Sequence, residues 1–239
     1  MSYIPAAPEG LRAGQTGIVI LGRVIMGDIA VTLVDLILRE LLTAEETTDG
    51  GDWVLAVTGT SAQQRREGLL DYEKRLLDGL GELGNEIRLS SLADEFGKVL
   101  DETRKILIRY AAHQRWIQHL HHDRRTAKGE ELAGQVLSFR RDLRRLVARG
   151  DQRALAGTLL PFALRFGLLS QEHAPLVRFA HAWVRTFADV PGWAPPEPAR
   201  PEYGNDQPLF ADIGKIPGAG LWSAGLVSQQ RSTRGWWSC

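Results

Sequence analysis

Four side chains that could bind a metal ion lie close together in the middle of this chain: His119, His121, His122 and Asp123. Imidazole and carboxylate groups at such spacing can bind zinc. In an extended strand, however, His122 points away from the other two histidines, and no Cys or distant His–Glu pair completes a set of ligands. We interpret these residues as solvated side chains of a β-hairpin, without a metal, and we expect no cofactor.

A second candidate is a run of arginines in FRRDLRRLVARGDQR. Arg141, Arg145 and Arg149 recur at four-residue spacing and line one face of a predicted helix. This arginine stripe suits phosphate groups or an acidic protein surface. Alternatively it pairs with the acidic N-terminal part of the same chain. Residues 1–100 carry 9 Lys and Arg against 16 Asp and Glu, whereas residues 101–153 carry 13 against 7.

A third set of residues could hold DNA phosphates. Lys105 and Arg109 lie one turn apart on a predicted helix, and Arg124 and Arg125 follow in the hairpin. Asp101, four residues before Lys105, and Glu102 are expected to pair with part of this charge. The N-terminal segment is less suited to phosphate, because its helix displays Asp28 and Asp35 and its hairpin is acidic. A protein surface fits that segment better. The acidic hairpin residues are Glu45, Glu46, Asp49 and Asp52.

The sequence contains no motif typical of an enzyme, such as a glycine-rich phosphate loop, HExxH or GxSxG. The only cysteine, Cys239, lies in an aperiodic tail without a positioned base. We therefore expect a non-enzymatic protein. The terminal STRGWWSC, with Trp236, Trp237 and Cys239, is either a tail without a role or a docking or modification site, which would make the protein a carrier or precursor.

The number of cysteines and the pattern of the first residues bear on the cellular compartment of the protein. One cysteine cannot form an internal disulfide, and the first residues lack the pattern of a secretory signal, so we expect a cytoplasmic protein. The most apolar stretch, residues 17–42, is interrupted by charges that are costly in a bilayer. We therefore expect no stable membrane span, and membrane association only through a partner.

The elements that position these residues follow from the apolar pattern. Residues 1–15, rich in Pro, Gly and Ala, predict an extended arm. A helix from Asp28 with one buried face is followed by an Asp-Gly-Gly turn and an alternating strand through Trp53 and Leu55, which predicts a hairpin. Residues 16–60 thus form a first winged-helix-like unit, and a polar segment marks a boundary after it.

Residues 69–150 predict a second winged helix-turn-helix unit. Its parts are a helix over 69–83, a short helix capped by Ser90, a helix over 100–114, a hairpin over 116–126 and a long exit helix over 130–147. Residues 155–193 predict a C-terminal helical pair that packs back onto these units. Residues 195–239, rich in Pro and Gly, predict a disordered tail.

Several segments, taken in order, resemble one known family. They are VTLVDLILRELL with its hairpin, YEKRLLDGL, TAKGEELAGQVLSFRRDL, LPFALRFGLL, FAHAW and PGW. They resemble the cytoplasmic C-terminal region of predicted bacterial membrane proteins of unknown function (domain of unknown function 2207), over about residues 15–193. The resemblance implies a detached bacterial relative with a tandem winged-helix-like fold, and it brings no established activity.

The sequence as a whole predicts a mainly α protein with small β-hairpins, an α+β fold. The first prediction of function is an interaction or adaptor module for a protein or peptide partner. The second is a DNA-binding transcriptional regulator. A homodimer is compatible with either.

Overall fold

The computed structural model describes residues 4–58, 67–118, 124–150, 155, 157–169, 173–190 and 193. The described chain is mostly helical with one small antiparallel sheet, so the predicted class, mainly α with some β structure, is confirmed. Among the described residues, no helix combines the length and apolar composition needed to cross a bilayer.

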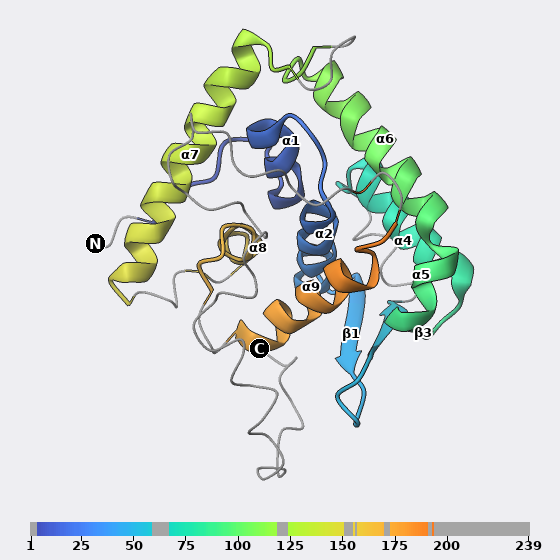
Figure 1. Ribbon diagram of the computed structural model, residues 1–239. Helices are drawn as coiled ribbons and strands as arrows, with labels where there is room; N and C mark the ends of the chain where they lie inside the picture. The colour runs from blue at the N-terminus through green and yellow to red at the C-terminus, as the bar shows by residue number, and fades with distance from the viewer. Residues whose placement is uncertain are drawn as a thin grey trace.

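Helix α2 (Met26–Leu38) lies at the centre of the molecule (Figure 1). A short 3-10 turn η1 (Ala13–Gln15) and helix α1 (Thr16–Leu21) precede it, and α1 ends at Gly22, whose φ of 70° suits glycine. Every residue of α2 except Asp35 and Leu38 is buried. The exposed face is therefore narrower than predicted: Asp35 and the adjoining Arg39 are partly exposed, whereas η1, α8 and α9 pack on the rest of the helix.

Asp28 is the clearest correction in this region. The sequence placed it on a displayed face, but it is fully buried in the first turn of α2. Its carboxylate accepts hydrogen bonds from the backbone N–H of Ile25 (2.9 Å) and Gly17 (3.2 Å), and it pairs with Arg165. A carboxylate in the first turn of a helix is favoured by the backbone dipole.

The predicted hairpin is present as β1 (Leu42–Glu46) and β2 (Trp53–Val57), paired antiparallel. A third strand, β3 (Ile87–Arg88), pairs with β2 and completes the order β1-β2-β3. Because β3 belongs to the second predicted unit, the sheet is continuous across the predicted boundary. The buried side chains likewise form one cluster that includes residues of every predicted unit from Leu11 to Trp193.

Residues 69–150 form the predicted helices in the predicted order. These are α4 (Asp71–Leu83), α5 (Leu92–Glu95) after the 3-10 turn η2 (Leu89–Ser91), α6 (Gly97–His113) and α7 (Ala127–Ala148). Ser90 does not cap the short helix as predicted, because its hydroxyl donates to Asp52 (2.6 Å) and the cap position is Ser91. Helices α6 and α7 diverge like the arms of an inverted V (Figure 1).

The C-terminal helices α8 (Leu159–Arg165) and α9 (Ala174–Thr186) pack on α2. Aromatic side chains of α9 contact both earlier segments. Phe179 lies 5.3 Å from Trp53 of the sheet, and Trp183 lies 5.9 Å from Phe96, measured between ring centroids. The helical pair thus completes the core. The predicted tail, residues 195–239, lies outside the described residues.

Candidate functional site: a cationic groove between α6 and α7

The hairpin that joins α6 to α7 closes the apex of the V. Its base is an antiparallel bridge between Ile117 and Arg125, extended by a hydrogen bond from Thr126 N–H to the Trp116 carbonyl (3.1 Å). The predicted hairpin is therefore present at its base. The histidine cluster, His119, His121 and His122 with Asp123, lies outside the described residues, as do Trp236, Trp237 and Cys239.

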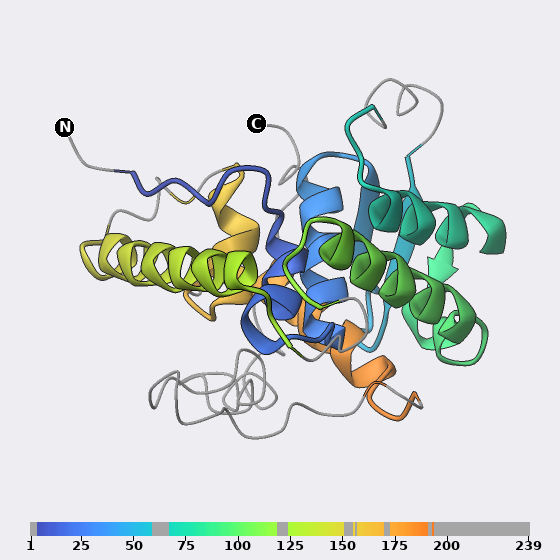
Figure 2. The ribbon, with the colours of Figure 1, turned by 90° about the horizontal axis from the view of Figure 1, so that it is seen from above.

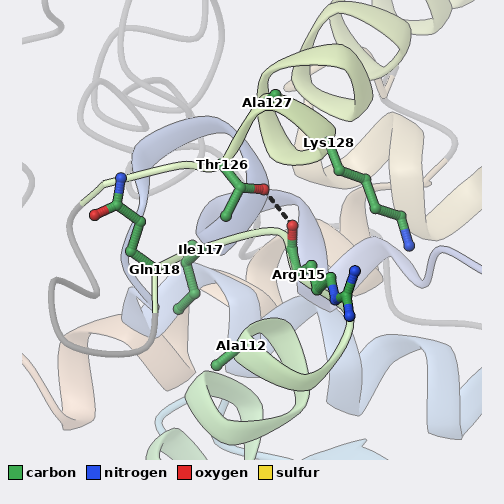
Figure 3. Close-up of a pocket in the computed structure, with 7 residues that line it drawn as sticks. All are labelled: Ala112, Arg115, Ile117, Gln118, Thr126, Ala127 and Lys128. Carbon is green, nitrogen blue, oxygen red and sulfur yellow. Dashed lines mark hydrogen bonds between the residues drawn. The ribbon is translucent and has the colours of Figure 1, made fainter.

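A hollow of about 530 Å³ lies beside this hairpin (Figure 3). The residues that line it come from the end of α6, the hairpin and the first turn of α7: Ala112, Arg115, Ile117, Gln118, Thr126, Ala127 and Lys128. In Figure 3 the Arg115 and Lys128 side chains extend on one side of the hairpin and Gln118 lies on the other. We call this hollow the apex groove.

Thr126 fixes the shape of the apex groove. Its hydroxyl oxygen accepts the Gly129 N–H (3.1 Å), which caps α7, and its O–H donates to the Arg115 carbonyl. Arg115 itself has a left-handed backbone with φ 60°. Gly129 packs so closely on the hairpin that an added Cβ would lie 1.8 Å from the Trp116 carbonyl oxygen. The left-handed turn at Arg115, the Thr126 cap and the close contact of Gly129 with the hairpin therefore fix the shape of the apex groove.

The lining of the apex groove combines apolar walls with a cationic rim. Ala112, Ile117 and Ala127 supply apolar surface, while the exposed Arg115 and Lys128 supply charge. None of the lining residues is acidic, and neither cation forms an ion pair with another described residue. The N-terminal end of α7 adds partial positive charge from its backbone N–H groups. Such a lining favours a ligand that is both apolar and acidic.

The predicted phosphate-binding residues lie on different elements. Lys105 and Arg109 are exposed on α6, and Arg124 is exposed in the hairpin. The arginine stripe, Arg141, Arg145 and Arg149, is exposed on α7, on the other arm of the V (Figure 1). The α6 cations and the arginine stripe therefore belong to two helices that diverge from the apex (Figure 1).

Arg125 has a structural position instead of the predicted binding position. Its side chain is only 11% exposed, and its Nε donates to Glu130 (2.8 Å). Its Nη1 donates to the carbonyls of Val19 and Ile20, in the last turn of α1. Arg125 thus ties the hairpin to the N-terminal helices and neutralises the carbonyl end of α1.

The acidic partners of these cations also differ from the prediction. Asp101 bonds to Arg104 (2.8 Å) instead of Lys105, and Glu102 bonds to Arg75 of α4 (2.7 Å). The hydrogen bond from Arg75 lowers the pKa of Glu102. No described ion pair joins the arginine stripe to residues 1–100, and Arg145 instead pairs with Asp142 of its own helix (3.3 Å).

The apex groove contains residues that the sequence did not single out. Lys128 belongs to the Thr-x-Lys-Gly sequence that begins α7, and Arg115 precedes the hairpin. Their signal was the capping threonine three residues before a glycine, which fixes where α7 begins. No short stretch of the sequence indicates that Arg115 and Lys128 lie together beside the hairpin.

One fully buried ion pair lies in the core, away from the apex groove. Arg165 Nε lies 2.9 Å from Asp28 Oδ1, and both side chains are 0% exposed. Burial raises the pKa of Asp28, and the adjacent guanidinium opposes that shift. Because the pair is enclosed, we interpret it as a structural ion pair that holds α2 and α8 together.

Among the described residues, no group of three or more His, Cys, Asp or Glu side chains is placed to hold a metal ion. Comparison of the chain with protein-family models, with curated proteins and with solved structures finds no match.

Proposed function

We propose that this protein is a non-enzymatic interaction module that binds an acidic segment of a partner protein in the apex groove. The observation that carries the proposal is the lining: apolar walls, two exposed cations at the rim and no acidic residue. Apolar burial would supply most of the affinity, and the cations would select acidic sequences. The winged-helix interpretation of residues 69–150 belongs to the same proposal, and the order α4, α5, α6, hairpin supports it.

A direct test uses a short fluorescent peptide in which Glu and Asp alternate with Leu and Phe. We expect fluorescence anisotropy to rise with added protein, and to rise far less for the same peptide with Lys in place of Glu and Asp. Replacing both rim cations (Arg115→Glu with Lys128→Glu) should weaken binding at least ~10-fold, because each cation would become a repelling anion.

The matched control is Lys74→Glu with Lys98→Glu, which makes the same charge change at exposed positions on α4 and α6 away from the apex groove. This variant should bind the acidic peptide like the wild type. Equal loss in both variants, or equal affinity for the acidic and basic peptides, would refute the proposal.

DNA binding is the second candidate, and the exposed face of α6 favours it. Lys98, Lys105, Arg109 and His113 are exposed along this helix. Two acidic residues lie among them, and both are paired: Asp101 with Arg104 and Glu102 with Arg75. Such a row could lie along a phosphate backbone, with Arg124 of the hairpin beside it.

Salt dependence separates the two candidates. Affinity for a labelled generic duplex should fall steeply between low and moderate salt if several phosphates are neutralised, whereas binding of the acidic peptide, which depends on apolar walls and only two cations, should fall less. Lys105→Glu with Arg109→Glu should then abolish duplex binding and leave the acidic peptide bound. Absence of duplex binding at low salt would eliminate the DNA candidate.

A further inference from the structure

Two segments of the described chain carry opposite net charge. Residues 137–150, the C-terminal half of α7, carry five basic residues and one acidic residue, a net charge of +4. Residues 71–95, from α4 to α5, carry three basic and seven acidic residues, a net charge of −4. Figures 1 and 2 place α7 and the α4–α5 region on opposite sides of the molecule.

Both ends keep exposed charge. Glu86, Asp94 and Glu95, which we call the acidic end, are exposed and form no ion pair with another described residue. On the arginine stripe, Arg141 and Arg149 likewise form none, while Arg145 is 74% exposed despite its bond to Asp142. These charges are therefore presented to whatever approaches either end.

The acidic end also carries an apolar side chain. Leu83, at the end of α4, is 37% exposed, and the only other large exposed hydrophobic residue of the described chain is Ile4. On the opposite end, Ala148 is exposed beside the arginines. The aliphatic stems of arginine side chains can cover such a leucine while their charged heads reach neighbouring carboxylates.

We propose that two copies of this protein associate head to tail, with the arginine stripe of one copy on the acidic end of the next. A second copy is the occupant because the two surfaces match in sign and in net charge, and because the chain has zero formal net charge, so copies do not repel. The contact is heterologous, and it therefore builds rings or open chains. Exposed ion pairs are weak and screened by salt, so association is strongest at low ionic strength.

Sedimentation velocity of the full chain over a range of concentrations tests this contact. We expect the weight-average sedimentation coefficient to rise with concentration at low salt and to stay constant at high salt. Arg141→Glu with Arg145→Glu should abolish the rise, and so should Glu86→Lys with Asp94→Lys. An equimolar mixture of these two variants should restore it, because each reversed surface then meets its complement.

A charge-neutral variant distinguishes a specific contact from general attraction. Leu83→Ser should weaken self-association several-fold without a change in charge, whereas the matched variant Ile4→Ser should leave it unchanged. A wild-type protein that sediments independently of concentration at low salt, or a mixture that fails to restore association, would overturn the proposal. Arg115→Glu with Lys128→Glu should still self-associate, so failure of the apex groove and failure of this contact are distinguishable.

Discussion

At the scale of single residues, the buried pair of Asp28 and Arg165 has the largest structural consequence. A buried ion pair is often no more stable than a well-packed apolar pair, but removing one partner leaves a charge without compensation. Asp28 also accepts the N–H groups of Gly17 and Ile25, so it joins α1, α2 and α8 at one point. The pair therefore specifies how these helices meet.

We predict that Arg165→Met lowers the free energy of unfolding by about 3–5 kcal/mol, because it leaves the Asp28 carboxylate buried and unpaired. In this variant the pKa of Asp28 rises further above its unfolded value, so the penalty is greatest at neutral pH and shrinks as pH falls and the carboxyl becomes protonated. Urea denaturation at two pH values measures this. Arg165→Met with Asp28→Asn should recover part of the loss, and an equal loss at both pH values would contradict the explanation.

A second prediction at this scale concerns His181 on α9. Burial, together with the nearby Arg185, lowers its pKa to about 4 from an ordinary value of 6.5. Because the folded pKa lies below the unfolded one, the unfolded state binds the proton more readily, and stability is lost as pH falls from about 6.5 toward 4. Denaturation midpoints should show this loss in the wild type and a smaller loss in His181→Gln. Parallel pH profiles would exclude His181 as the cause.

At the scale of elements, the junction of α6 and α7 decides whether the apex groove exists. Thr126 caps α7 and donates a hydrogen bond to the Arg115 carbonyl before the hairpin. One side chain therefore positions both sides of the apex groove.

We predict that Thr126→Val lowers the free energy of unfolding by about 1 kcal/mol, the usual cost of a lost N-cap. It should also weaken binding of the acidic peptide, since Arg115 and Lys128 are no longer held in register across the hairpin. Thr126→Ser keeps the hydroxyl and serves as the control. Urea denaturation and peptide anisotropy report the two effects, and a valine variant that matches the serine variant in both would contradict the assignment.

At the scale of the whole molecule, the C-terminal helices α8 and α9 are an integral part of the hydrophobic core. Helix α2 packs on both α8 and α9, and the aromatic side chains of α9 reach the sheet and Phe96. Sheet and core both cross the segment at which the sequence predicted a boundary.

We predict that a chain ending at residue 150 does not unfold cooperatively, because it exposes the apolar face of α2 and leaves Asp28 without Arg165. Thermal unfolding followed by near-ultraviolet circular dichroism would show a broad transition or none. A sharp transition at the wild-type midpoint would show that residues 16–150 fold without the helical pair.

Much of the secondary structure was determined by local sequence. The helices of residues 71–148 and the hairpin at Trp53 followed from apolar periods of 3.6 and 2, which any short window reveals. The same windows located Lys105, Arg109 and the arginine stripe on exposed faces, as the structure has them. Periodicity succeeds here because one face of each element packs against a neighbour and the other faces water.

Only the tertiary structure decided which distant residues meet. The local sequence predicted Asp28 to be exposed, because its partner, Arg165, lies 137 residues further along the chain. Likewise β3 pairs with a strand of the other predicted unit, and Arg125 bonds to the end of α1. Arg115 and Lys128 form one rim only because the hairpin folds back between them. Local sequence fixes the period and the ends of an element, whereas the partner of a buried charge depends on the path of the whole chain.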